Sequence, residues 1–349
     1  DPGQLQSLLQ SDPINPVGRI IKTVRPEDGS EPIVVKQPIG RDARLLLWVE
    51  QFVPSINGFV VRFNRRIETD TLNLYGSSAL PGGPDVLGTD STGRPVRGSI
   101  ILDADGKGFR FINTGDALPA GVYNITLKSG LDAIHSFFGS LDGKGTGEPG
   151  SDYTRATVVN GAPGVRVGVP DFVRAPGQHV DLGTAKAMPI YLHSDGTLRS
   201  LSFAVRFNPA LLNIAEAQLG ANLPRGTELS LERETSGLIR VTINAPAPLP
   251  AGRIEVAHLL ASVPAGAPYG SQQIIGVNNV EANGRSVPGG GDDGLQLIAR
   301  PGDANANGLV DSEDRRLAQR VMQGTDTGFA AWPNIDPAVV MGDHDAGAG

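Results

Sequence analysis

Short stretches in which apolar and polar residues alternate recur from about residue 44 to residue 299. In the stretch 58–64, Phe59, Val61 and Phe63 lie at every second position, and Arg62 and Asn64 lie between or beside them. A period of two is typical of a β-strand that buries one face. The pattern predicts strands at 45–49, 58–64, 98–102, 108–112, 122–128, 188–192, 201–207, 238–244, 253–261 and 273–277.

These predicted strands fall into two blocks, 42–160 and 161–299, and turn-forming residues separate the strands within each block. The segments 103–108 and 118–121 combine Asp, Pro and Gly in the manner of tight turns. The composition agrees, because 46 glycines, 27 prolines and 5% aromatic residues disfavour long helices. A chain of 349 residues is long enough for two or three domains with separate cores. The sequence therefore predicts a mainly β protein with two antiparallel β-sandwich domains.

The first 41 residues form a different kind of segment, rich in Pro, Gly and Asp with two short β-branched runs. These runs are 19–24 and 31–36, and they fit either isolated strands or an extended tether. An exposed strand such as 33–36 could also add to the open sheet edge of a neighbouring molecule. We expect residues 1–41 to be an extended N-terminal segment.

The segment 303–314 has the spacing of a calcium-binding loop. If Asp303 is position 1, oxygen-bearing side chains occupy positions 1, 3, 5, 9 and 12, and Gly308 at position 6 permits the sharp bend. Calcium takes six to eight oxygen ligands at roughly 2.3–2.6 Å, and such a loop can supply them. Val310 at position 8 is expected to point inward. The predicted Ca²⁺ ligands are Asp303, Asn305, Asn307, Asp311 and Asp314 through side chains and Leu309 through its backbone carbonyl.

A helix is predicted after this loop but not before it. The segment 288–302 contains too many Gly and Pro residues to form an entering helix, whereas 312–323 places acidic residues in its first turn and brings Leu317 and Val321 to one face. A calcium loop with only an exiting helix, and with Asp at position 12, resembles the dockerin module. The alternative is a surface turn rich in Asn, Asp and Gly that holds no metal.

Dockerins carry two such repeats, and the second is incomplete in this sequence. Asp343 and Asp345 are the candidate ligands of a second metal site. However, Gly347 and Ala348 depart from the loop pattern, and His344 offers an imidazole, which is a poor calcium ligand. The segment 300–349 is therefore expected to be a small dockerin-like calcium module with one complete loop.

Two further resemblances concern the predicted sandwiches. The stretches 58–64, 71–74 and 118–126 resemble bacterial immunoglobulin-like domains found in surface-layer proteins. The segment 207–214, followed by a turn that ends at Gly226, resembles the cohesin domain, in which it follows a strand of a jelly-roll sandwich. The resemblances imply a bacterial cell-surface or extracellular protein with an immunoglobulin-like domain (42–160), a cohesin-like domain (161–299) and the dockerin-like tail.

The cohesin and dockerin resemblances imply a protein partner, because members of these two families bind each other. In dockerins, loop positions 10 and 11 and the basic residues that follow commonly face the cohesin; here these are Ser312, Glu313, Arg315 and Arg316. If the tail docked on its own chain, the result would be a closed monomer. If it docked on a neighbour, repeated head-to-tail contacts would build a filament. The partner is then another copy of the chain or a different protein with a cohesin or dockerin.

Other function classes find less support in the residues. The sequence has no cysteine, and its five histidines are scattered without a catalytic spacing, so no enzyme site is predicted. The net charge of −7, without a basic cluster, disfavours nucleic acid, and no apolar run is long enough to span a membrane. The chain begins at Asp1 without a signal peptide, which suggests a mature or trimmed piece of a longer protein.

Three alternatives remain open at this point. The chain could be an adhesin or a carbohydrate-binding or scaffold module of a larger surface protein, although an aromatic platform is hard to find with only Trp48 and Trp332. It could be attached to a catalytic domain outside these residues. The glycine-rich segment 141–153 could hold a second kind of calcium loop or be a flexible loop.

Overall fold

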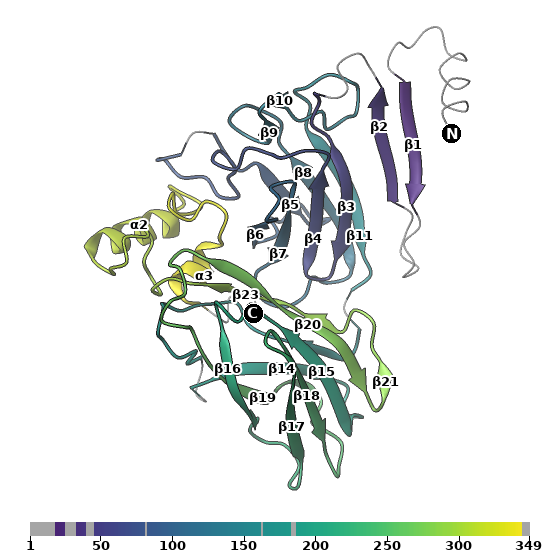
Figure 1. Ribbon diagram of the computed structural model, residues 1–349, viewed down its shortest axis with the longest axis vertical. Helices are drawn as coiled ribbons and strands as arrows, with labels where there is room; N and C mark the ends of the chain where they lie inside the picture. The colour runs from purple at the N-terminus through teal and green to yellow at the C-terminus, as the bar shows by residue number, and fades with distance from the viewer. Residues whose placement is uncertain are drawn as a thin grey trace.

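Two β-sandwiches lie end to end, and a small helical tail packs at the junction between them (Figure 1). The computed structural model describes residues 45–80, 82–161, 163–182 and 186–343, together with the backbone of 18–24 and 33–39. The protein is mainly β with antiparallel sheets, as the alternating pattern predicted. None of the helices in these ranges is long and apolar enough to cross a membrane.

The first sandwich contains a four-stranded and a three-stranded sheet. The strand order of the four-stranded sheet is β3 (Val49–Ser55), β4 (Gly58–Phe63), β7 (Gly108–Asn113) and β6 (Gly98–Leu102). The strand order of the three-stranded sheet is β11 (Tyr153–Val159), β8 (Gly121–Leu127) and β5 (Val86–Thr89). Their inward residues form one apolar core, which includes Phe52, Phe59, Phe63, Phe109, Phe111, Ile125 and Leu127. Gly58 allows the close approach of β4 and β7, because a Cβ there would lie 2.2 Å from the Phe111 carbonyl oxygen.

The second sandwich is larger. One sheet contains β16 (Asn213–Leu219), β19 (Gly252–Ser262), β14 (Met188–Ser194), β12 (Arg166–Gly168) and β22 (Gly291–Asp292). The other contains β13 (Phe172–Val173), β23 (Gly294–Leu297), β20 (Gln272–Ala282), β15 (Ser200–Arg206), β18 (Leu238–Asn244) and β17 (Glu228–Thr235), with β21 (Arg285–Ser286) paired to β20. A separate apolar core lies between these two sheets.

The N-terminal segment contributes a hairpin of two strands. β1 (Gly18–Val24) pairs antiparallel with β2 (Ile33–Ile39), from Gly18 opposite Ile39 to Val24 opposite Ile33. These two strands form a sheet of their own. Both β-branched runs of the N-terminal segment therefore become strands.

Most predicted strands appear close to their predicted bounds, and 98–102 and 238–244 have those bounds in the structure. The strand predicted at 45–49 is wrong, since β3 begins only at Val49, and the buried Leu47 makes an isolated bridge to Leu141 instead. Three long strands, β11, β16 and β17, were not predicted. In β16 and β17 most side chains are exposed or half-buried, so the sequence carries little apolar alternation there.

The tail shares a third apolar cluster with both sandwiches. Ile112 of β7 and Leu295 and Leu297 of β23 contribute to it from the two sandwiches. The tail contributes Ala304, Phe329, Trp332, Ile335, Val339 and Val340, and α2 (Ser312–Met322) and α3 (Pro337–Met341) are its two helices. The segment after residue 300 thus docks on its own chain and joins the two sandwiches.

Candidate functional site

The predicted calcium loop lies where the tail leaves the second sandwich, and Asp303 is its most buried ligand. The Asp303 side chain is fully buried. Its Oδ1 accepts a hydrogen bond from the Asn307 amide at 3.1 Å, and its Oδ2 accepts one from the Gly308 amide at 2.7 Å. Oδ2 also accepts from the hydroxyl of Tyr269, which belongs to the second sandwich. The carboxylate therefore organises the loop and ties it to the neighbouring domain.

At the other end of the loop, Asp311 and Asp314 form the capping box of α2. Asp311 Oδ1 accepts from the Glu313 amide at 2.8 Å, and Asp314 Oδ2 accepts from the Asp311 amide at 2.8 Å. Asp314 is buried, and its Oδ1 also accepts from the Ala304 and Asn305 amides at the start of the loop. Reciprocal capping stabilises the first turn of a helix. The predicted helix 312–323 is confirmed as α2, and Leu317 and Val321 pack together against the third cluster.

The middle of the loop follows the predicted turn, with one correction. Gly308 has a φ of +82°, the left-handed conformation that glycine adopts without strain. The side-chain oxygens of Asn305 and Asn307 accept from the Asn307 and Leu309 amides. The prediction that Val310 points inward is wrong, because this side chain is 54% exposed, and Leu309 is exposed as well.

The donor set and the turn of this loop fit calcium. Carboxylate and amide oxygens from five positions lie on this loop. The Oδ1 atoms of Asp303, Asn305 and Asn307 each accept one amide and keep a second lone pair for a metal. In the described part of the chain, however, no three Asp, Glu or His side chains are gathered into a ready-made metal cluster. Calcium at Asp303, Asn305, Asn307, Leu309, Asp311 and Asp314 is therefore taken up below as a proposal.

The second candidate metal site is described only in part. Asp343 is exposed and follows Gly342, which ends α3 in a left-handed conformation with a φ of +82°. Asp345 and His344 lie outside the described residues.

The four candidate partner-binding residues lie on the outward face of α2. Ser312, Glu313, Arg315 and Arg316 are all exposed. Glu313 and Arg316 form an ion pair with an Oε1–Nη2 distance of 2.6 Å. Met322, the last residue of the same helix, is 86% exposed. The contacts of the tail with its own chain thus leave this face uncovered.

A second group of tail residues, which sequence reasoning missed, fastens α3 to the first sandwich. Asp336 is fully buried and accepts hydrogen bonds from Arg97 Nε at 3.1 Å, Arg97 Nη2 at 2.5 Å and Thr114 Oγ1 at 2.8 Å. It also caps α3 through the Ala338 amide. The sequence motif Asp336–Pro337 signals a helix start. Nothing local in the sequence signals the arginine, which is 239 positions away.

The loop that follows α2 is also fastened to the first sandwich by a buried aspartate. Asp326 is buried and accepts from Arg320 Nε at 2.7 Å and from the Ser78 amide at 2.9 Å. The hydrogen bond from Arg320 lowers the pKa of Asp326 to about 2. The residues 326–341 are therefore committed to contacts within the chain.

The glycine-rich segment 141–153 also contains an aspartate-centred loop. Asp142 is buried, and it accepts from the amides of Thr146 at 2.9 Å and Gly147 at 2.8 Å. These are the fourth and fifth residues after the aspartate, the same spacing that Asp303 uses. Lys144, however, occupies the third position of this loop, where a calcium loop places an oxygen ligand. The local fold agrees with a calcium loop, but its side chains do not.

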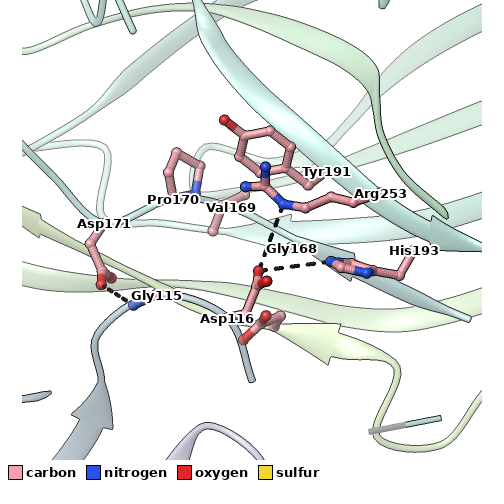
Figure 2. A pocket seen from close by; sticks show the side chains of 10 residues that line it. Gly115, Asp116, Gly168, Val169, Pro170, Asp171, Tyr191, His193 and Arg253 are labelled. Atoms are coloured by element: carbon pink, nitrogen blue, oxygen red, sulfur yellow. Dashed lines mark hydrogen bonds and ion pairs between the residues drawn. The ribbon is translucent and has the colours of Figure 1, made fainter. Parts of the chain in front are cut away.

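A polar cleft lined by several titratable groups lies between the two sandwiches (Figure 2). Asp116 of the first sandwich lies 3.8 Å from both His193 Nε2 and Arg253 Nε of the second. Arg253 stacks on the Tyr191 ring at 3.6 Å from its centroid. Asp292 Oδ2 is 3.5 Å from Arg166 Nε. The enclosed space is about 20 Å³, which is room for one water rather than a substrate.

Two buried carboxylates in this cleft hold the sandwiches together through backbone amides. Asp171 accepts from the Gly115 amide at 3.1 Å and from the Leu295 amide at 2.7 Å, and Asp292 accepts from the Ala117 amide at 3.0 Å. Burial raises the pKa of each of these carboxylates to about 7. We interpret the cleft as a joint between domains.

Lowering the pH from about 8 to about 5.5 is expected to stabilise the protein. A carboxylate whose pKa is raised in the folded state binds protons more tightly there, so its stabilisation is complete below its unfolded pKa near 3.8 and is lost as the pH rises through about 7. Asp85, whose pKa burial also raises to about 7, acts in the same direction. Urea unfolding at several pH values and fixed calcium measures how the free energy of unfolding changes with pH. Asp171→Asn should make this pH dependence weaker, and an unchanged pH dependence in that variant would contradict the raised pKa of Asp171.

Comparison with known proteins gives structural similarity only. No family model matches the chain, and no curated protein matches its sequence. Its structure is similar to a non-cellulosomal cohesin of Archaeoglobus fulgidus, with a TM-score of 0.32 and 13% identity over 39% of this chain and 92% of that one. It is also similar to the third ScaC cohesin of Acetivibrio cellulolyticus, crystallised with the ScaB dockerin, with a TM-score of 0.33 and 18% identity over 39% of this chain and 99% of that one. These scores are too low to assign a partner.

Proposed function

We propose that this chain is an extracellular or cell-surface structural module that binds calcium and assembles head to tail with copies of itself. The observation that carries the proposal is the division of the tail into two parts. Most residues of 326–341 are buried or half-buried against the chain's own sandwiches, whereas the outward face of α2 remains exposed. The tail is thus anchored at one end and presents a rigid face at the other.

In this proposal, bound calcium orders the loop 303–314, which sets the orientation of the exposed face of α2. The ion would be held by Asp303, Asn305, Asn307, Leu309, Asp311 and Asp314, and its charge would offset the mutual repulsion of three aspartates in one turn. Asp311 and Asp314 also cap α2, so the loop and the helix are fixed by the same side chains. The orientation of α2 should therefore depend on the metal.

Charge complementarity favours a second copy as the partner of α2. Arg315 and Arg316 lie on the exposed face of this helix. The strands β16 and β17 are neighbours at one edge of the second sandwich, although they belong to different sheets, and they carry the exposed acidic residues Glu216, Glu228 and Glu232. A contact between two different surfaces of identical chains does not close on itself unless the rotation forms a ring, so it builds rings or filaments.

Light scattering in calcium and in excess chelator tests this assembly. We expect particles larger than a monomer in calcium, and a return to monomer when the ion is removed or when both arginines are changed in R315E/R316E. The matched control is Arg285→Glu, which reverses an exposed charge on β21, outside α2, β16 and β17, and should leave assembly unchanged. Restoration of assembly on mixing R315E/R316E with E228K/E232K would identify the two surfaces.

Monomers under both conditions would overturn self-assembly through this chain. Polymers that persist in chelator would instead favour strand addition by the N-terminus. The structure supports this second candidate in one respect, because β1 and β2 pair only with each other among the described strands. A two-stranded hairpin is marginally stable alone, so it gains by joining a larger sheet. Deletion of residues 1–41 distinguishes the two modes.

A further inference from the structure

A groove of about 680 Å³ opens at the end of the first sandwich that lies away from the second sandwich. Three segments line it: the loop 64–69 after β4, the turn 102–107 between β6 and β7, and the hairpin of β9 (His135–Ser136) and β10 (Gly139–Ser140). None of the calcium, tail or cleft residues described above contributes to it. Its lining combines cations with exposed aromatic rings.

Arg65 is a partly buried cation that lacks an acidic partner among the described residues. Its Nε atom is buried without a hydrogen-bond partner, and its guanidinium lies 5.1 Å from the centroid of the Phe138 ring. Burial, with no compensating charge, lowers the pKa of Arg65. A cation that has lost water without gaining a counter-ion favours binding of an anion.

The charges around Arg65 leave the groove positive. Arg66 and Lys107 line the same groove, and the Arg66 side chain lies over Gly106. Two carboxylates, Glu68 and Asp103, also line it, and Arg62 pairs with both Asp103 at 2.7 Å and Asp105 at 2.5 Å. With Arg62 and Asp105 included, the cations still outnumber the carboxylates, and Arg65 is the cation without an acidic partner among the described residues. An anionic ligand would meet a net attraction that extends across the groove.

Phe137 and Phe138 form the rim at the turn of the β9–β10 hairpin. Phe137 is 85% exposed and Phe138 is 58% exposed, and their ring centroids are 5.3 Å apart. Exposure of two adjacent aromatic rings to water is unfavourable, and these rings add nothing to the core. Exposed apolar groups of this kind are typical of binding surfaces. The two tryptophans, by contrast, are buried, so the aromatic platform of this chain is made of phenylalanines.

We propose that this groove binds an anionic polysaccharide that carries uronic acid groups. The rings of Phe137 and Phe138 would stack on the apolar faces of sugar rings, and Arg65, Arg66 and Lys107 would hold carboxylates. The groove is open to solvent, so it can admit part of a chain-like ligand. An anionic membrane fits less well, because the protein as a whole carries a net charge of −7.

Titration calorimetry of the whole protein in calcium tests the site, with hyaluronan oligosaccharides as the uronic acid probe. We expect binding that weakens when salt is raised from about 50 to about 200 mM, because screening shortens the reach of the charges. Neutral chitin oligosaccharides should bind to the unaltered protein at least about tenfold more weakly than hyaluronan does. Hyaluronan should also bind at least about tenfold more weakly to Arg65→Gln and to F137A/F138A than to the unaltered protein. The matched control Arg225→Gln removes an exposed arginine elsewhere and should bind like the unaltered protein.

Several results would overturn the proposal. Equal affinities for the chitin and hyaluronan probes would show that the charge of the ligand does not determine binding. Tighter binding to phosphatidylglycerol vesicles or to polyglutamate would assign the groove to a membrane or to an acidic peptide. An equal loss in Arg225→Gln, or no binding of hyaluronan, would show that no such site exists. Thermal unfolding of each variant verifies that Arg65→Gln and F137A/F138A remain folded.

Discussion

Excess chelator is expected to lower the stability of this protein, and the tail is expected to loosen before either sandwich. At a free calcium concentration about 100 times the dissociation constant, an ion that binds only the folded state stabilises it by about 3 kcal/mol. The ligand Asp303 is fully buried, and Trp332 Nε1 donates to its backbone carbonyl at 2.8 Å. The fluorescence of Trp332 should therefore report the loss of the ion. Limited proteolysis should show the first cuts within 300–343.

Asp303→Asn separates binding of the ion from a general effect of the chelator. The amide keeps one oxygen to accept from the Asn307 or Gly308 amide but removes the charge, so this variant should show the same unfolding midpoint with and without calcium. The matched control Asp70→Asn removes an exposed carboxylate and should keep the full calcium shift. If Asp303→Asn retains that shift, the loop is an ordinary turn and the calcium proposal fails.

The sequence predicted those parts of the molecule that short-range patterns determine. The alternation around Phe59, Val61 and Phe63 predicted β4, and the acidic first turn with Leu317 and Val321 predicted α2. The spacing from Asp303 to Asp314 predicted a loop with a sharp bend at Gly308, and this glycine has a φ of +82°. Each of these signals lies within about twelve residues, where backbone geometry fixes which side chains share a face.

The remaining features depend on contacts between distant segments. Gly328 is required because a Cβ there would lie 2.3 Å from Tyr75 Cβ, and nothing near Gly328 in the sequence indicates this neighbour. The inward orientation expected for Val310 failed for the same reason: the tail buries its other side, through Trp332 and Ile335. The basic groove likewise joins Arg65, Lys107 and Phe138, which no local spacing relates. Such contacts follow from the packing of whole domains.

Breaking the contact between Arg97 and Asp336 is expected to destabilise the tail strongly. Removing one partner of a fully buried ion pair costs about 3–5 kcal/mol, because the other charge is left without compensation. Arg97→Ala leaves the fully buried Asp336 carboxylate without its counter-ion. Because solvent already screens the Arg97 side chain, which is 57% exposed, we expect a loss at the low end of this range, about 3 kcal/mol. Asp336→Ala also removes the cap of α3 and leaves Thr114 Oγ1 without its acceptor, so it should cost about 3 kcal/mol or more.

Urea unfolding of the two single variants and the double variant measures the coupling. Because both residues act in one contact, the double variant should be more stable than the sum of the single losses predicts, by about 1–2 kcal/mol. The pair between Glu313 and Arg316 is the control, since it has nearly the same length, 2.6 Å against 2.5 Å, but lies on an exposed helix face. Arg316→Ala should leave the free energy of unfolding nearly unchanged, because solvent screens an exposed pair. If Arg97→Ala and Arg316→Ala lowered the free energy of unfolding equally, burial of Asp336 would not be what makes the Arg97–Asp336 contact strong.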